Sequence, residues 1–183
     1  MDDLQAIQRL RSGDIGGLEA LVSRYEAKAM RVAFLITHDE ALAEDVVRET
    51  FMSLYRRIQQ FDPTRPFEPY LLRSVVNAAL NATRKAHRQV SLGGDAEQVE
   101  RLLEQAASVE SEVEYRQLKQ AIIQALAGLE PRQRAVVVQR YYLEMSEKEM
   151  AAALDAPPGT VKWLLSAARS KLRNLLDSER SAE

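Results

Sequence analysis

Apolar residues recur at steps of three and four residues in three stretches of the first half of the chain, over residues 18–36, 47–61 and 72–80. This spacing places the apolar side chains on one face of a helix and is typical of amphipathic helices that share a core. The pattern predicts a bundle of three or four helices over residues 1–90.

Capping and proline signals predict the borders of these helices. Thr37, with Glu40 three residues later, forms a capping box that predicts a helix start at residues 38–40. That helix must end before Pro63, since the residue that precedes a proline disfavours the helical conformation. Pro66 and Pro69 follow within a few residues and indicate a turn and the start of the third helix.

The last third of the chain continues the helical pattern. A stripe of Leu118, Ile122, Ala125 and Leu129 predicts one helix, and Pro131 predicts the first residue of the next.

Residues 146–175 have the pattern of a helix-turn-helix unit. Ser146 and Glu149 form a second capping box and predict a short helix. Residues 155–159 predict a turn, and apolar residues then recur at steps of four and three over residues 161–175. A short helix, a tight turn and a longer basic helix are the arrangement whose second helix enters the DNA major groove, although any helical hairpin has the same periodicity.

The whole pattern predicts an all-α protein with two small helical domains. We expect a three- or four-helix bundle over residues 1–90 and a helix-turn-helix domain over residues 118–183. The linker between them, residues 91–117, is acidic: residues 89–119 carry 3 basic and 7 acidic side chains. Such a linker permits both an extended and a closed arrangement of the domains.

Composition excludes several classes of site. The 183 residues include no Cys and two His, which rules out a disulfide scaffold, a thiolate metal site and a multi-histidine metal site. No phosphate-binding glycine loop and no nucleophile with a suitably spaced base are found. We expect no catalytic residue, no metal and no cofactor. No apolar run approaches the roughly 20 residues that span a bilayer, and the acidic start is unlike a signal peptide, so we expect a cytoplasmic protein.

Two short basic stretches stand out in a chain whose formal net charge is −2. Residues 65–88 and residues 159–173 each carry a net charge of +4. Such stretches are either solvated helix faces or local contacts with an anionic partner such as nucleic acid. The charge pattern alone leaves both interpretations open.

The only Trp of the chain is predicted to point away from the core. At about 100° per residue, Trp163 lies opposite the apolar stripe of the last helix and beside basic side chains. It indicates either a surface for a partner or packing against another part of the chain, such as the first domain in a closed arrangement.

Short motifs in both halves of the chain occur together, in this order, in one known family. Residues 43–51, 61–67 and 70–77 form the first group, and residues 129–134, 146–154 and 158–162 form the second. The first group resembles the second conserved region of bacterial extracytoplasmic-function sigma factors, which are group IV of the sigma-70 family. The second group resembles the fourth region of the same family.

The resemblance implies a protein that binds core RNA polymerase, directs it to promoters and opens the DNA, without being an enzyme. The helix matching residues 41–60 would dock on the polymerase, which implies core-binding roles for Asp45, Arg48, Glu49, Phe51, Met52 and Tyr55. The helix matching residues 67–88 would read and melt the −10 element, through Tyr70, Arg73, Asn77, Arg84, Lys85 and Arg88. The last helix would read the −35 element, through Thr160, Lys162, Trp163, Ser166, Arg169 and Arg173. Cations suit phosphates, and Asn and aromatic rings suit unpaired bases.

Departures from the family pattern predict altered recognition. Arg48 stands where the family usually has Gln. After Lys162 the family commonly has arginines where this chain has Leu164 and Ala167, and Trp163 replaces a small residue. We therefore expect weak or altered −35 recognition, an outward Leu164, and a gain in promoter affinity when both positions are changed to Arg.

The resemblance also implies control by an anti-sigma factor. The expected partners are core RNA polymerase, promoter DNA and an anti-sigma factor, with no membrane insertion and no small-molecule substrate. The protein would associate with the nucleoid when active, and an anti-sigma factor could hold it at the membrane.

The sequence leaves other functions open. The last helix lacks two arginines that the family commonly has. This favours a decoy that binds an anti-sigma factor without driving transcription. A helix-turn-helix repressor or activator would bind duplex DNA without polymerase, usually as a two-fold dimer. An enzyme with Glu44, Asp45 and Glu49 as metal ligands is disfavoured, because adjacent positions on a helix point about 100° apart.

Overall fold

The structure is a computed structural model that describes residues 1–89 and 122–180, with the backbone alone for residues 87–89 and 176–180. The predicted linker, residues 91–117, lies outside the described residues. The elements are α1 (Asp3–Arg11), α2 (Gly16–Thr37), α3 (Glu40–Arg57), the short 3-10 helix η1 (Ile58–Gln60), α4 (Phe67–Gln89), α7 (Pro131–Val137), the π-helical turn η2 (Val138–Tyr142), α8 (Glu147–Leu154) and α9 (Pro158–Arg180). Residues 122–127 are also helical.

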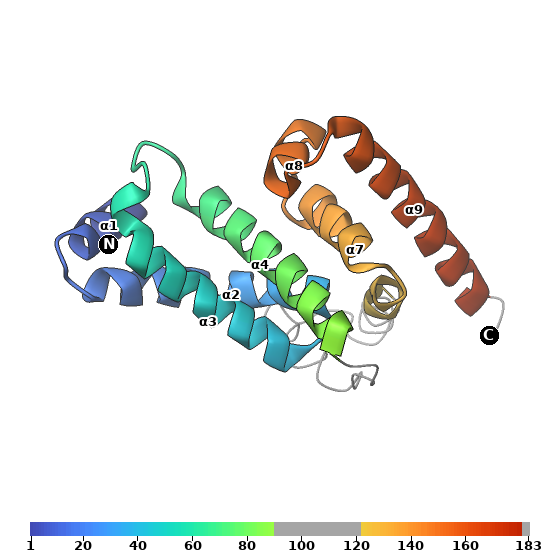
Figure 1. Cartoon of the computed structure of the whole chain (residues 1–183), viewed down its shortest axis with the longest axis horizontal. Helices are drawn as coiled ribbons and strands as arrows, with labels where there is room; N and C mark the ends of the chain where they lie inside the picture. Colours follow the sequence, from blue (N-terminus) through green and yellow to red (C-terminus); the bar gives the residue numbers. More distant parts are fainter. Residues whose placement is uncertain (90–121, 181–183) are drawn as a thin grey trace, which may run out of the picture.

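Helices α1 to α4 form the predicted bundle, in which α2 packs against the other three (Figure 1). The apolar stripes predicted in α3 and α4 are confirmed as its core. The buried members are Val47, Phe51, Leu54, Ile58, Phe61, Leu72, Val75, Val76, Ala79 and Leu80. The all-α fold is therefore confirmed.

The junction between α2 and α3 differs from the prediction in its capping residue. Helix α3 begins at Glu40, as predicted, but the side chain of Asp39 caps it by accepting a hydrogen bond of 2.9 Å from the backbone N–H of Leu42. Thr37 is the last residue of α2. His38 ends α2 in the left-handed conformation, with φ of 57°, which turns the chain before Asp39.

The C-terminal helices closely follow the predicted capping and proline signals. Pro131 is the first residue of α7, and Ser146 caps α8 in a capping box with Glu149. Asp155 ends α8 in the left-handed conformation, with φ of 47°. Helix α9 begins at Pro158, so the last two residues of the predicted turn, 158–159, belong to the helix instead.

Of the predicted stripe before α7, Ala125 and Leu129 are buried as predicted, and Ile122 is wrong. Ile122 is 45% exposed, whereas Ile123 and Leu126 are buried. The reason is tertiary, because Ile123 packs into the core of the N-terminal bundle. Leu118 lies outside the described residues.

The C-terminal helices pack directly on the bundle, which gives the chain a closed arrangement. Helix α7 contacts α2 and α4, and α8 contacts α4. Ala135 and Val138 join Ile123 in the same apolar core as the bundle. Helix α9 packs on α7 and α8 and forms the outer edge of the molecule (Figure 1). No helix among the described residues is long and apolar enough to cross a membrane.

Candidate polymerase and nucleic-acid interfaces

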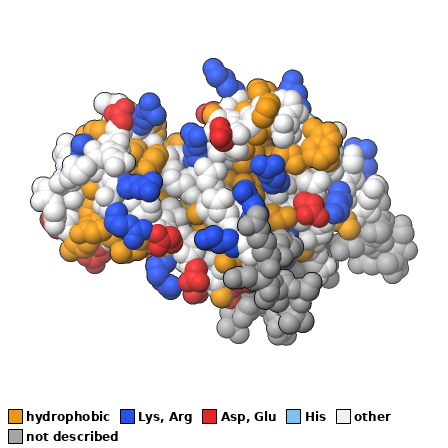
Figure 2. Space-filling view, in the orientation of Figure 1, with side chains coloured by type: hydrophobic (Ala, Val, Ile, Leu, Met, Phe, Trp, Pro, Cys, Tyr) orange, Lys and Arg blue, Asp and Glu red, His pale blue; other side chains and the backbone are white. Residues whose placement is uncertain are grey.

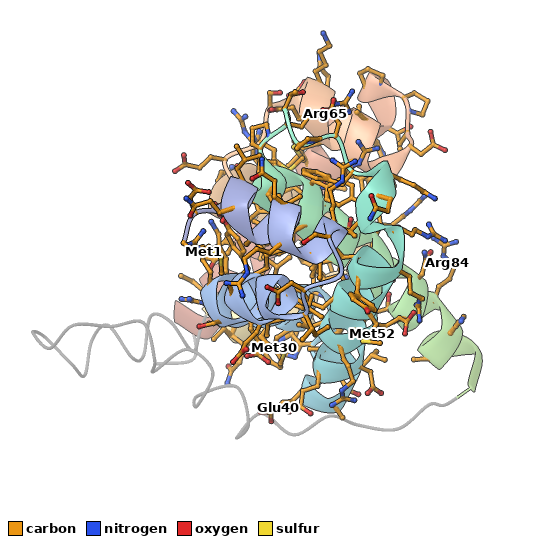
Figure 3. All side chains as sticks on the ribbon, turned by 90° about the vertical axis from the view of Figure 1, so that its left-hand side faces the viewer. Met1, Met30, Glu40, Met52, Arg65 and Arg84 are labelled. Carbon is orange, nitrogen blue, oxygen red and sulfur yellow. The ribbon has the colours of Figure 1, made fainter. Side chains whose placement is uncertain are left out.

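Helix α3 presents a polar face opposite its buried stripe. Its exposed residues include five of the six predicted core-binding residues, namely Asp45, Arg48, Glu49, Met52 and Tyr55. Figure 3 shows this helix from the side, with Met52 labelled. Two ion pairs run along the face: Arg48 to Asp45 at 3.0 Å, and Arg56 to Glu49. Both are well exposed, so they hold the side chains only weakly and leave them available to a partner.

Phe51 is the exception among the predicted core-binding residues. Its side chain is 5% exposed and belongs to the core of the bundle. It lies four residues after Val47 and three before Leu54, which are buried on the same face of α3. The predicted surface role of Phe51 is therefore wrong, and its role is packing.

Helix α4 carries the predicted −10 residues on the face that its apolar stripe leaves free. Arg84 and Lys85 are exposed, and Figure 3 shows Arg84 directed away from the bundle. Asn77 is half-buried. The ring of Tyr70 packs on Phe61, with 4.8 Å between ring centroids, and remains partly exposed. The side chain of Arg88 lies outside the described residues.

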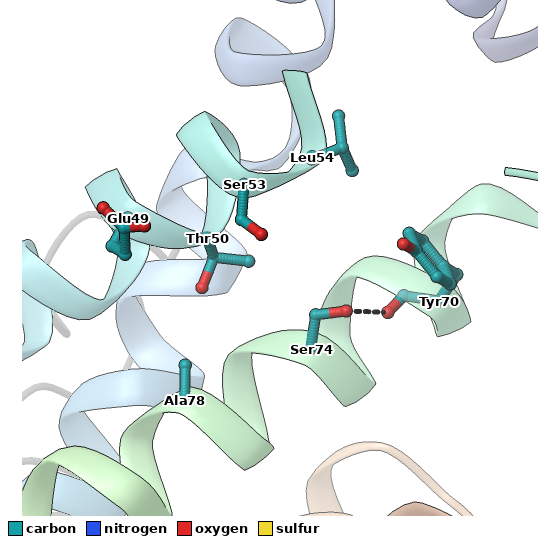
Figure 4. A pocket seen from close by; sticks show the side chains of 7 residues that line it. All are labelled: Glu49, Thr50, Ser53, Leu54, Tyr70, Ser74 and Ala78. Atoms are coloured by element: carbon teal, nitrogen blue, oxygen red, sulfur yellow. Dashed lines mark hydrogen bonds between the residues drawn. The ribbon is translucent and has the colours of Figure 1, made fainter. Parts of the chain in front are cut away.

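A groove of about 190 Å³ separates the exposed faces of α3 and α4 (Figure 4). Glu49 and Ser53 line it from α3, and Tyr70 and Ser74 line it from α4. The hydroxyl of Ser74 donates a hydrogen bond of 2.9 Å to the carbonyl oxygen of Tyr70, as the dashed line marks. The groove thus places Glu49, a predicted core-binding residue, opposite Tyr70, a predicted −10 residue.

The C-terminal helices cover part of the basic face of α4. The guanidinium of Arg73 donates a hydrogen bond to the carbonyl oxygen of Ala152 in α8. A hollow of about 710 Å³ lies beside this contact, lined by Arg65 and Tyr70 from the bundle and by Met145 from the loop before α8. Figure 2 shows the surface hollowed between the two halves, with Lys and Arg side chains spread over both.

Arg84 lines a second, smaller hollow between the halves. This space of about 240 Å³ is bounded by Arg84 and Thr83 of α4 and by Pro131 and Arg132 of α7. Closure therefore brings Arg73 and Arg84 next to the C-terminal helices, while Lys85 stays at the exposed surface.

Helix α9 presents the predicted −35 residues on its outer side. Lys162, Trp163, Ser166, Arg169 and Arg173 are exposed, and Thr160 is half-buried. Trp163 is 65% exposed although the two halves are packed together. The alternative in which Trp163 packs against the first domain in a closed arrangement is therefore wrong. Closure covers part of α4 and leaves the outer side of α9 open.

Leu164 does not point outward, contrary to the expectation. Its side chain is 6% exposed and packs with Val161, Leu165 and Met150. An Arg at this position would put a charge into the core, so changing positions 164 and 167 to Arg is no test of DNA affinity. Ala167 is half-buried.

Two residues that the sequence did not single out join the halves of the molecule. Arg134 is buried, and its guanidinium donates hydrogen bonds to the carbonyl oxygens of Ile36, Ala127 and Leu129. Burial lowers the pKa of this guanidinium, and backbone carbonyls supply its bonds. His38 approaches the carbonyl oxygen of Ile123 through its Nε2 atom at 3.1 Å.

Two models of one family match the two halves of the chain. Sigma-70 region 2 matches residues 21–89, and Sigma-70, region 4 matches residues 119–172. The matched regions contain α3, α4 and the helix-turn-helix formed by α8 and most of α9. The chain belongs to the extracytoplasmic-function group of the sigma-70 family. This membership makes the protein a transcription initiation factor, and the family is not one of enzymes.

Curated relatives match this family member over nearly its full length. The ECF RNA polymerase sigma factor SigW of Bacillus subtilis is 28% identical over 176 residues, with 93% of this chain and 94% of the relative covered. The ECF RNA polymerase sigma-E factor of Haemophilus influenzae is 29% identical over 182 residues, with 95% of each covered.

Solved structures of similar proteins share the fold. CnrH, in complex with the cytosolic domain of CnrY, has a TM-score of 0.63 and 26% identity, covering 96% of this chain and 97% of CnrH. The sigma factor RpoE of Bartonella quintana, in complex with the anti-sigma factor NepR, has a TM-score of 0.62 and 20% identity, covering 87% of this chain and 96% of RpoE.

Proposed function

We propose that this protein binds core RNA polymerase and directs it to a set of promoters, under the control of an anti-sigma factor. The observation that carries the proposal is the pair of matched regions. Each presents exposed basic residues on a long helix, α4 in the first region and α9 in the second. Residues 1–90 would bind the polymerase and the −10 element, and residues 118–183 the −35 element. The linker, residues 91–117, would join them.

The exposed chemistry of each helix supports its role. On α3, a face of paired acidic and basic side chains with the exposed Met52 and Tyr55 suits a protein partner better than DNA. On α4, Arg84 and Lys85 suit the phosphates of the −10 element, while Tyr70 and Asn77 suit unpaired bases. On α9, the basic outer side suits the major groove of the −35 element.

The closed arrangement would have to open before the −10 element binds. In the closed arrangement the Arg73 guanidinium donates a hydrogen bond to the carbonyl oxygen of Ala152, so α8 occupies part of the space beside Arg73 that DNA would need. We therefore assign the closed chain to the free or inhibited protein. The hollow of about 710 Å³ between the halves offers an anti-sigma factor contacts with both at once. The protein would act in the cytoplasm, and a membrane-bound inhibitor would hold it at the membrane.

The test is transcription in vitro. The purified protein is added to core RNA polymerase and fragmented DNA from its own genome, and the transcript starts are sequenced. New starts that share a −10 motif would support the proposal, and a common −35 motif would show what α9 still reads. Core binding without new starts would argue against an active factor.

A decoy that binds an anti-sigma factor without driving transcription is the second candidate. Trp163 favours it, because a large exposed ring stands on the outer side of the recognition helix. The exposed basic residues of α4 argue against it. Capture of an anti-sigma factor without measurable core binding would favour the decoy.

A further inference from the structure

Tyr141 contacts the outer side of the helix-turn-helix from a position outside it. It lies in the π-helical turn η2, and its side chain is 58% exposed. The Nε–H of Arg169 in α9 donates a hydrogen bond of 2.9 Å to the Tyr141 hydroxyl oxygen. The guanidinium carbon of Arg169 lies 6.0 Å from the centroid of the Tyr141 ring. The tyrosine therefore holds the guanidinium by a hydrogen bond, and the ring lies at the outer limit of a cation–π contact.

The hydrogen bond to Tyr141 leaves the two terminal nitrogens of the Arg169 guanidinium free. A guanidinium has five N–H donors, and Nε carries only one of them, so the two terminal nitrogens keep their hydrogens for another acceptor. The phenol is neutral and does not offset the positive charge. By contrast, Lys162 on the same helix lies 3.9 Å from the carboxylate of Glu147, which competes with an anionic ligand for its charge.

The place of Arg169 on α9 indicates which anion it would meet. Arg169 lies about 80° from the buried stripe, at the flank of the exposed surface, whereas Ser170 lies near the opposite side at about 180°. When a helix enters the major groove, its outermost side chains face the base edges and its flanks face the walls, where the phosphates are. A fixed guanidinium at the flank suits a phosphate.

We propose that Tyr141 is a positioning residue for −35 binding, which orients the guanidinium of Arg169 toward a phosphate of the duplex. The proposal rests on the proposed function. The side chain of a free arginine samples many rotamers, and an arginine held in one of them loses less conformational freedom on binding. Tyr141 thus compensates in part for the arginines that the recognition helix lacks.

The experiment measures binding of the holoenzyme, core polymerase with this protein, to a fluorescent promoter duplex found by start mapping. Tyr141→Phe keeps the ring and removes the hydroxyl, and Tyr142→Phe is the matched control, since the Tyr142 hydroxyl has no hydrogen bond within the described part of the chain. We expect Tyr141→Phe to weaken binding about 2- to 5-fold and leave its salt dependence unchanged. Tyr142→Phe should have no effect.

The double variant separates positioning from any other role. Arg169→Ala should lower the slope of log affinity against log salt by about 0.9, the value for one lost phosphate contact. In the Arg169→Ala background, Tyr141→Phe should add nothing. An equal loss from Tyr141→Phe in both backgrounds, or no loss in the wild type, would overturn the inference alone. A wild-type protein that forms no promoter-binding holoenzyme would overturn the proposed function as well.

Discussion

The Nε–H of Arg134 donates a hydrogen bond of 2.7 Å to the carbonyl oxygen of Ile36, which joins the C-terminal helices to the bundle. Ile36 lies in the last turn of α2, where carbonyl groups have no partner within the helix and the helix dipole is negative. The same guanidinium bonds the carbonyl oxygens of Ala127 and Leu129. One buried cation therefore satisfies carbonyls from both halves of the molecule.

Replacing Arg134 should destabilise the fold. Arg134→Met keeps most of the length but leaves three carbonyls without this donor, so we expect the free energy of unfolding to fall by about 2–3 kcal/mol. Urea unfolding measures the change. Arg132→Met is the control, since Arg132 is an exposed arginine of the same helix, and its effect should stay within about 0.5 kcal/mol. Equal effects of the two variants would contradict the assigned role.

Removing Arg73 should loosen closure. Because the chain has no Cys, Glu44→Cys on α3 and Ser170→Cys on α9 give two unique exposed sites for fluorescent labels. Arg73→Ala should shift the energy-transfer distribution of the free protein toward longer distances, changing the closed-to-open ratio about 5-fold. Lys85→Ala, on the same helix and exposed, should leave it unchanged. An unchanged distribution for Arg73→Ala would show that its bond to Ala152 does not hold the halves together.

His38 should make stability depend on pH. Burial of the imidazole lowers its pKa below the usual value, and the nearby Arg134 cation also lowers it. In the unfolded chain the pKa is about 6.5, so just below that pH the unfolded state binds a proton that the folded state does not. The free energy of unfolding should therefore fall as the pH drops below about 6.5. His38→Asn, which tolerates the left-handed backbone, should show a smaller fall. Identical pH profiles would exclude His38 as the source.

Trp163 should report binding at the outer side of α9. As the only Trp, and 65% exposed, it should give a solvent-exposed emission spectrum that soluble quenchers reach in the free protein. Because it is exposed in the closed chain, this spectrum does not distinguish closed from open. Addition of a −35 duplex to the free protein, whose only Trp is Trp163, should protect it from the quencher. No protection at saturating duplex would remove Trp163 from the DNA-binding face.

A side chain at Gly17 should destabilise the fold. A Cβ there would lie 2.3 Å from the carbonyl oxygen of Ala6 and 2.7 Å from the backbone nitrogen of Leu10, because α1 and α2 cross at this point. Gly17→Ala should lower the free energy of unfolding by about 1–3 kcal/mol. Gly159→Ala is the matched control, since nothing lies within 4 Å of its Cβ position, and it should be neutral or stabilising. A neutral Gly17→Ala would show that the two helices can separate without cost.

The helices could be predicted from the sequence wherever local signals decide them. The Ser146 capping box, Pro131 and the stripes of α3 and α4 are local features, and the structure confirms them. Ile123 differs because its burial depends on the bundle, which lies far away in the sequence.

The candidate site could be predicted less well. A motif identifies which residues of the chain match, but it does not say which of them lie on the exposed face of a helix. Phe51 and Leu164 stand next to exposed residues in their motifs, yet each has its side chain in a core. The contacts of Arg134 with Ile36 and of Tyr141 with Arg169 join residues 98 and 28 positions apart. No periodicity within one helix contains such information.

The most direct test of the central claim is permanganate reactivity of promoter thymines, which detects unpaired bases. With core polymerase and the wild-type protein, thymines in the −10 element should become reactive. Arg84→Ala should reduce this reactivity several-fold by removing a phosphate contact, while Arg132→Ala, across the same hollow on α7, should leave it unchanged. No reactive thymines with the wild type, or equal reactivity in both variants, would contradict the claim that α4 opens the −10 element.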